Sequence, residues 1–512
     1  MMKKLFFLLL LGLAWNANAQ SAQKQLPELN LAKAEVEAHM RFLASDELEG
    51  RRTGSRGNNV AARYIATQLE LYGVKPVPGA QGYYQPVPFE SVAPPQVNTL
   101  QLDQNSYESK KDFLWLSGDA KEVKTTAVFA NYGWVDAANG RDDFKNVDVK
   151  GKVVFVLPGT SEADAANPQA IFEASAKKRQ WAAEKGAVAL VELYRISFPW
   201  NFFTNYFGKE SLQLAEDQEN DQNTSLAYGW FKEPSTNPLA DLISGKTSTI
   251  PITFSATGGK RDKVMSQNVI GVIEGSDPKL KNEYILLSAH YDHVGVGKQG
   301  GGAYTPQDSI FNGARDNAFG TTAVLAAAKA FAQKPPKRSV IILLVTGEEI
   351  GLLGSQYYAN HPLIPLNKVV FNLNCDAAGY NDTGLVTIFG LGRTGTDEQI
   401  RTGAKQFGLN VNADPAPEQN LFDRSDNVSF AAKGIPALTF SPGFTAFDQA
   451  ILQYYHQATD NPETIDFNYL HKYSQAYIHT ARLIGDRAQR PTWKEGDKYE
   501  KAGKELYNNV KP

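Results

Sequence analysis

Two adjacent acidic residues, Glu348 and Glu349, follow a run of aliphatic and β-branched residues from Ser339 to Leu344. The run has no polar break, which predicts a strand that is buried on both faces. Acids at the end of a central strand lie where open α/β folds carry their ligands. Since neighbouring side chains in irregular backbone can point in different directions, one carboxylate can bind a cation while the other faces a substrate.

Candidate partners for these acids end other predicted strands. In EYILLSAHYDHVG, the apolar run ends at His290, and Asp292 is close enough to orient an imidazole that binds a metal. Asp316 lies between a glycine-containing loop and an alanine-rich predicted helix, and Asp376 ends a third apolar run, VVFNLNCDAAG. His456 lies far downstream, in ILQYYHQATD. Together these residues predict a metal site at one edge of a sheet.

Five segments carry a resemblance to a known family. HYDHVG, NGARDNAFG, GEEIGLLGS, NLNCDAAG and YHQATD occur in the order found in the co-catalytic two-zinc aminopeptidases, relatives of bacterial leucyl aminopeptidases and of glutamate carboxypeptidase. The resemblance implies an α/β fold with a mixed, mostly parallel central sheet flanked by helices. It also implies an exopeptidase that removes residues from the N-terminus of peptides.

The same resemblance implies two zinc ions per chain. One zinc would be held by His290, Asp316 and Asp376, and the other by Asp316, Glu349 and His456. Glu348 would be the general base, and Asp292 would orient His290. This set makes chemical sense, because two dications about 3.5–4 Å apart repel, and a bridging carboxylate with terminal carboxylates neutralises most of that charge. One imidazole per metal suits zinc.

The sequence predicts five consecutive parts. The last half of the chain holds the zinc motifs, and a β-rich stretch before it resembles the protease-associated domain inserted in many such peptidases. The predicted parts are a signal peptide at 1–19, a first part of the peptidase domain at 20–120, the insert at 121–255, the catalytic domain at 256–490 and a charged tail at 491–512.

The N-terminus predicts export. MMKKLFFLLLLGLAWNANAQ has two lysines, a short apolar run and an Ala-x-Ala ending, which predicts cleavage after Ala19 and a periplasmic or secreted protein. The apolar run is shorter than the roughly 20 residues of a spanning helix, so no stable membrane insertion is expected. A net charge of −3 over 512 residues gives no support for nucleic acid as a partner. The oligomeric state stays open.

Three further features bear on the site. The aromatic stretch from Phe198 to Phe207 could line a substrate cleft, although packing within the insert is favoured. Arg315 and Asn427 depart from the commoner wording of the family at positions near the metals, which leaves the substrate pocket in doubt. Cys375, the only cysteine, is expected to be buried and structural rather than a nucleophile.

The predicted substrate is a peptide with a free N-terminus. A site rich in carboxylates attracts an α-amine, whereas a C-terminal carboxylate needs a basic pocket, for which Arg393 and Arg424 are the candidates. A carboxypeptidase therefore remains an alternative, as does a relative of glutaminyl cyclase, which typically works with a single zinc. A non-catalytic, receptor-like relative is disfavoured, because all five ligands and the base are present.

Overall fold

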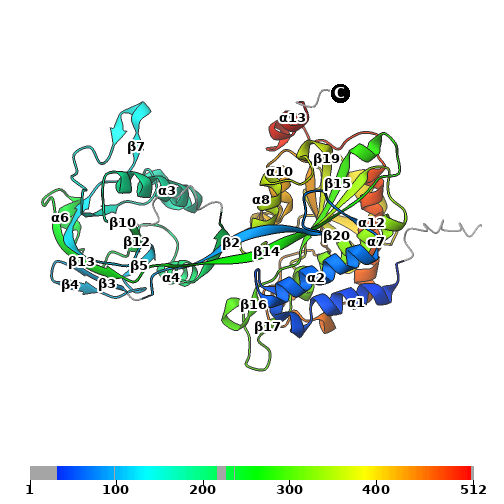
Figure 1. The fold of residues 1–512 in the computed structure, drawn as a ribbon, viewed down its shortest axis with the longest axis horizontal. Helices are drawn as coiled ribbons and strands as arrows, with labels where there is room; N and C mark the ends of the chain where they lie inside the picture. Colours follow the sequence, from blue (N-terminus) through cyan, green and yellow to red (C-terminus); the bar gives the residue numbers. More distant parts are fainter. Residues whose placement is uncertain (1–30, 97, 216–225, 236, 509–512) are drawn as a thin grey trace, which may run out of the picture.

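A computed structural model describes residues 31–96, 98–215, 226–235 and 237–508, and it has two lobes joined by a long two-stranded ribbon (Figure 1). Each lobe is built around its own sheet. The predicted signal peptide lies outside the described residues. Across the described part of the chain, none of the helices combines the length and the apolar character needed to cross a bilayer.

The larger lobe contains a ten-stranded sheet in the order β11-β2-β14-β18-β15-β19-β22-β20-β21, with β1 paired to β14. Its strands are β1 (Lys75–Pro76), β2 (Tyr84–Ala93), β11 (Ser211–Leu214), β14 (Lys260–Ile273), β15 (Tyr284–His290), β18 (Ser339–Val345), β19 (Val369–Cys375), β20 (Leu385–Phe389), β21 (Asn410–Ala413) and β22 (Ala437–Pro442).

The four central strands β18, β15, β19 and β22 are parallel to one another. They are β-branched and aliphatic, and every residue of β18 and β19 is buried, as continuous apolar runs predict. Strands β2, β14 and β11 on one side, and β20 against β22 on the other, pair antiparallel. The predicted mixed α/β fold is confirmed, with parallel pairing at the centre of the sheet and again between β20 and β21 at one edge.

Helices cover both faces of this sheet (Figure 1). Alternate residues of β15 and β18 point to opposite faces, so that Leu287 and Ile342 join one core cluster while Leu286 and Ile341 join another. The first cluster packs under α1 (Lys33–Leu43), α2 (Arg56–Leu71), α7 (Phe319–Gln333) and α12 (Phe467–Gly485), with α9 (Asp397–Lys405) against α12. The second packs under α8 (Leu353–Asn360), α10 (Asn427–Ala431) and α13 (Glu500–Asn508).

The smaller lobe contains an eight-stranded sheet in the order β4-β3-β13-β6-β9-β10-β12-β5. Its strands are β3 (Asn98–Leu102), β4 (Asn105–Tyr107), β5 (Phe113–Ser117), β6 (Lys121–Phe129), β9 (Val153–Val156), β10 (Ala189–Leu193), β12 (Ala227–Phe231) and β13 (Ile250–Ala256). Its helices are α3 (Pro168–Glu184), α4 (Trp200–Phe207) and α6 (Ala240–Ile243). It also contains a short two-stranded sheet of β7 (Val135–Asp136) and β8 (Arg141–Asp142). A second two-stranded sheet, of β16 (Gly295–Val296) and β17 (Ile310–Phe311), belongs to the larger lobe.

The structure moves the predicted boundary of the insert. Strands β3, β4 and β5 belong to the second sheet although they precede residue 121, because β3 pairs with β13 and buries Leu100 and Leu102 in its core. In the opposite sense, β11 lies within the predicted insert but pairs with β2 at the edge of the larger sheet. The continuous pairing of β2 with β14 forms the ribbon between the lobes (Figure 1).

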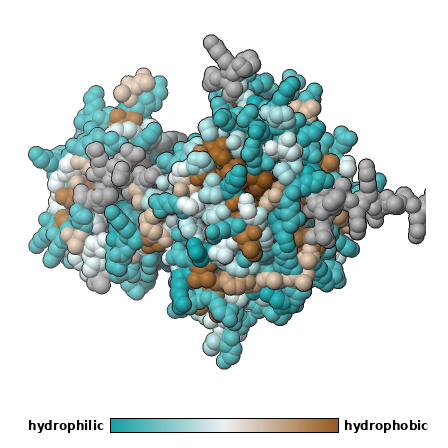
Figure 2. Space-filling model, turned by 45° about the vertical axis from the view of Figure 1, so that its right-hand side comes forward, coloured by the Kyte–Doolittle hydropathy of each residue, from teal (hydrophilic) through white to brown (hydrophobic). Residues whose placement is uncertain are grey.

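The segment predicted as a charged tail packs against the larger lobe through two aromatic residues. Trp493 is buried and its indole donates a hydrogen bond of 3.0 Å to the carbonyl of Gly434, and the Tyr507 hydroxyl donates one of 2.6 Å to that of Val369. In α4, Phe203 is buried as favoured, whereas Phe202 and Tyr206 are exposed. Figure 2 shows a mostly hydrophilic surface with separate hydrophobic areas on both lobes.

Candidate metal centre and active site

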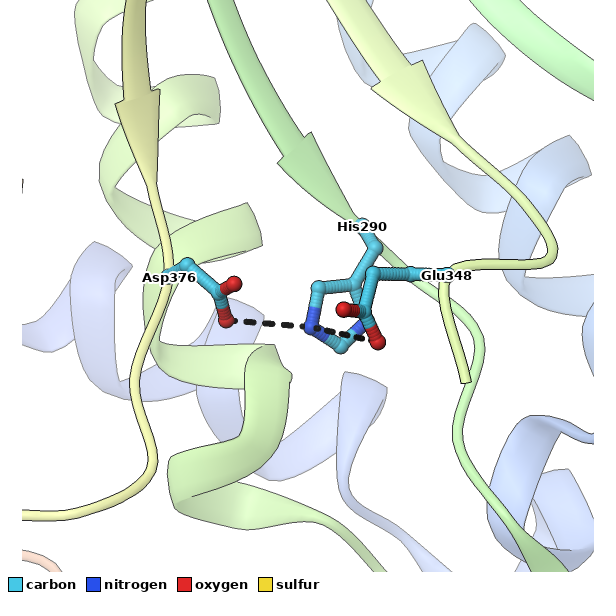
Figure 3. Close-up of side chains that lie close together, drawn as sticks. All are labelled: His290, Glu348 and Asp376. Atoms are coloured by element: carbon cyan, nitrogen blue, oxygen red, sulfur yellow. Dashed lines mark hydrogen bonds and ion pairs between the residues drawn. The ribbon is translucent and has the colours of Figure 1, made fainter. Parts of the chain in front are cut away.

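The ends of three central strands bring acids and a histidine together, as the sequence predicts. His290 is the last residue of β15, Glu348 lies in the loop after β18, and Asp376 follows β19 directly. In Figure 3 the three side chains converge, with the imidazole between the two carboxylates. The His290 Nε2 atom lies 3.2 Å from Asp376 Oδ1 and 3.9 Å from Glu348 Oε2.

Asp316 lies between the two predicted histidine ligands. Its Oδ1 is 3.3 Å from His290 Nε2, and its Oδ2 is 3.2 Å from His456 Nε2. The side chain is buried in the short helical segment Ala314–Ala318 that precedes α7, and its two oxygens face different imidazoles. This is the placement expected of a carboxylate that bridges two cations.

The adjacent glutamates have different surroundings. Glu349 Oε2 lies 3.0 Å from His456 Nε2, whereas Glu348 lies on the side of His290 and Asp376. By ligand-atom spacing, two groups within 4.8 Å could hold an ion: His290 with Glu348 and Asp376, and His290 with Asp316 and Glu349. Spacing alone thus leaves Glu348 able to act as a ligand, while the contact with His456 is made by Glu349.

Charge coupling within the cluster is strong. Burial opposes a charged imidazole at His456, but Glu349 and Asp316 outweigh it and raise the pKa to about 11. Although burial opposes ionisation of Glu349, His456 and His293 lower its pKa to about 2. Burial raises the pKa of the Glu348 carboxyl well above its ordinary range, with His290 opposing and Asp376 reinforcing the shift.

The residues present fit bound zinc. Two imidazoles and four carboxylates with converging oxygens form a largely buried acidic cluster that needs cationic charge, which protons on the histidines can supply. Zinc binds neutral imidazole and ionised carboxylate, so the ions would replace these protons. The mixture of nitrogen and oxygen donors, with an imidazole on each side, suits zinc better than magnesium or calcium.

Asp292 lies beside His290 but contacts it differently from the prediction. The His290 Nδ1 is 3.2 Å from the main-chain oxygen of Asp292 and 3.8 Å from its carboxylate, so the carbonyl is the nearer acceptor. The buried carboxylate accepts hydrogen bonds from the Thr53 hydroxyl at 3.0 Å and the Glu348 main-chain N–H at 3.3 Å. Asp292 therefore also fixes the loop that carries the glutamates.

Two residues that the sequence analysis did not assign hold the acids in place. His293 is buried, and its Nδ1 donates a 2.6 Å hydrogen bond to Glu349 Oε1, opposite the oxygen that faces His456. The Ser425 hydroxyl donates a 2.5 Å hydrogen bond to Asp376 Oδ2. The second histidine of HYDHVG was a signal for the first contact, whereas Ser425 is distant in sequence and offered none.

We expect His293→Ala to weaken zinc binding by about 10- to 100-fold, because Glu349 loses the donor that orients it. Competition with a chromogenic chelator measures the affinity, and zinc held by Glu349 should show the change. His361→Ala is the matched control, because His361 is exposed at the end of α8. Unchanged affinity in His293→Ala would show that Glu349 is held without this contact.

Arg315 and Asn427, the two residues that differ from the usual motifs of the family, do not line the pocket beside the acids. Arg315 is buried, and Asp460 pairs with its guanidinium at 3.0 Å while accepting the main-chain N–H of Arg315 at 2.8 Å and of Asp316 at 3.2 Å. Asp460, the last residue of YHQATD, thus ties the loop of Asp316 to that of His456. Asn427 is buried, and its amide donates to the carbonyl of Phe422 at 3.1 Å.

A pocket opens beside the cluster. Besides the acids and His456, its walls include Ala377, Phe389, Leu421, Arg424 and Tyr455. The Tyr455 ring stacks on His456 with centroids 4.2 Å apart. Arg424, one of the two arginines named from the sequence, therefore lies at the site.

Two other residues that the sequence analysis considered, Arg393 and Cys375, have partners within the protein. Asp497 binds the Arg393 guanidinium through two hydrogen bonds of 2.7 and 3.0 Å, which leaves it poorly suited to bind a substrate carboxylate. Cys375 is buried beside the Tyr473 hydroxyl, and burial raises the pKa of its thiol, consistent with a structural role.

Comparison with known proteins agrees with this geometry. Residues 268–481 match the model of peptidase family M28. The chain is 30% identical over 172 residues to a vacuolar membrane protease of Lachancea thermotolerans, covering 33% of this chain and 15% of the relative. It is 30% identical over 186 residues to the probable leucine aminopeptidase 2 of Aspergillus oryzae, covering 35% and 34%. The matches thus span only a minor part of either relative.

A solved structure shares the fold over nearly the whole chain. The aminopeptidase from Aneurinibacillus sp. strain AM-1 superposes with a TM-score of 0.56 at 20% identity, covering 91% of this chain and 97% of that one. The matched family segment contains all the predicted ligands and Glu348 but not the second sheet, whose identity as a protease-associated domain stays a prediction. The five motifs that assemble at one site all lie within residues 268–481, the segment that matches the model of peptidase family M28.

Proposed function

We propose that the protein is an exported zinc aminopeptidase that uses two metal ions and releases residues from peptides with a free N-terminus. The observation that carries the proposal is the position of Asp316, because one of its carboxylate oxygens faces His290 and the other faces His456. Bound zinc supplies a Lewis acid and an activated water. The export and the two-ion count rest on the N-terminal sequence and on the donor set.

The remaining chemistry falls to the protein's own residues. Glu348, with its raised pKa and its place beside His290 and Asp376, accepts the proton of the attacking water and returns it to the leaving amine. The carboxylates of Glu348 and Asp376 face the pocket and attract the α-ammonium group of the substrate. Burial raises the pKa of the Tyr455 phenol, so it stays protonated and can donate to the carbonyl oxygen.

Acetylation of the substrate's amine tests the direction of attack. We expect leucine p-nitroanilide to be hydrolysed, and its N-acetyl derivative to show a kcat/KM lower by about 100-fold or more, because the acyl group removes the positive charge that the carboxylates bind. Equal values for the two substrates would contradict the aminopeptidase and favour a broader amidohydrolase. A carboxypeptidase would prefer a blocked amine with a free C-terminal carboxylate.

A further inference from the structure

One exposed cation at the pocket has no carboxylate partner among the residues that the structure describes. Arg424 contacts the carbonyl of Gln419 and the hydroxyl of Tyr455, both at 3.4 Å, which is near the limit of a hydrogen bond. Its neighbour Asp423 is already bound by Lys498 at 2.6 and 2.7 Å and by the hydroxyl of Tyr499 at 3.0 Å. The Arg424 guanidinium therefore keeps most of its donors free.

The Arg424 guanidinium shares its pocket with acidic and apolar residues. The rest of the pocket's charge comes from the metal-site acids and His456, and its apolar wall comes from Phe389 and Leu421. Arg424 thus places a positive group in the same cavity as the acids. Guanidinium pairs with carboxylates through two parallel hydrogen bonds, and it does so most strongly where apolar surface limits access of water.

We propose that Arg424 binds a carboxylate of the substrate and so makes the enzyme favour peptides that carry one close to the scissile bond. This inference rests on the proposed aminopeptidase function, since it assumes that the amine lies at the acids. The carboxylate has two sources within reach of a bond held at the metals. It is either the side chain of an N-terminal aspartate or glutamate, or the C-terminus of a dipeptide.

Two substrate pairs distinguish the sources. Leucyl-glycine against leucyl-glycinamide tests the terminal carboxylate, and glutamyl anilide against glutaminyl anilide tests the side chain. In Arg424→Gln, we expect the ratio of kcat/KM within one pair to fall by about tenfold or more, chiefly through KM, because one charge-assisted contact is lost. Arg424→Lys should restore part of the ratio, since it keeps the charge without the planar fork.

The matched control is Arg401→Gln, which removes an exposed guanidinium from α9, away from the pocket-lining residues. It should leave both ratios at their wild-type values. Ratios in Arg424→Gln equal to those of wild type in both pairs would overturn the proposal. Failure of the aminopeptidase function itself is distinguishable, because the wild-type protein would then hydrolyse leucine p-nitroanilide and its N-acetyl derivative with equal kcat/KM.

Discussion

Glu348→Gln lowers kcat by about 10³-fold while the protein keeps its zinc, if Glu348 is the general base. Glutamine has nearly the shape of glutamate but cannot accept the proton of the attacking water. Glu348 lies on the side of His290 and Asp376, and its loop is fixed by Asp292, so the change removes a proton acceptor without removing the contacts that hold Glu349. Steady-state rates and bound zinc, measured on the same preparation, give both readings.

The control is Glu398→Gln, which makes the same chemical change on the exposed side of α9 and should leave kcat at the wild-type value. Loss of zinc with only a modest loss of rate in Glu348→Gln would mean that the two adjacent glutamates have exchanged roles. The spacing of ligand atoms, which admits either glutamate, makes this a necessary comparison.

Replacing Asp316 with alanine should remove zinc from both positions and lower kcat/KM by several orders of magnitude. Its Oδ1 faces His290 and its Oδ2 faces His456, so it is placed to serve both ions. Without it, each position also loses charge that offsets the repulsion between the two dications. Elemental analysis after gel filtration, with circular dichroism to confirm folding, measures the effect.

His456→Ala is the informative comparison, because it removes a ligand from one position only. His290 and Asp376 lie 3.2 Å apart with Asp316 beside them, and this half of the site keeps all its donors. We therefore expect His456→Ala to retain about one zinc and Asp316→Ala to retain less. Equal retention by the two variants would argue that Asp316 does not bridge.

The sequence predicted the parts of the site that follow directly from strands. His290 ends a buried strand and Glu348 and Asp376 follow buried strands, and the carboxyl ends of parallel strands meet at one edge of a sheet. His293, Ser425 and Asp460 act through other residues, and their contacts join segments up to 145 residues apart. Residue type alone does not reveal such pairings.

The limits of the second lobe could not be read from composition for a related reason. β3 joins its sheet by pairing with β13, at a sequence separation that local patterns do not record. The ribbon of β2 and β14 spans both lobes, so no polar linker marks where one ends. The same holds for the C-terminal segment, whose charged composition conceals the buried Trp493.

Zinc titration of the metal-free protein tests the two-metal account most directly. Activity on leucine p-nitroanilide and bound zinc are followed together as zinc is added in steps. The account predicts that activity rises until two zinc ions are bound per chain and then stays constant. Full activity at one bound zinc per chain, or activity that does not depend on zinc, would contradict it.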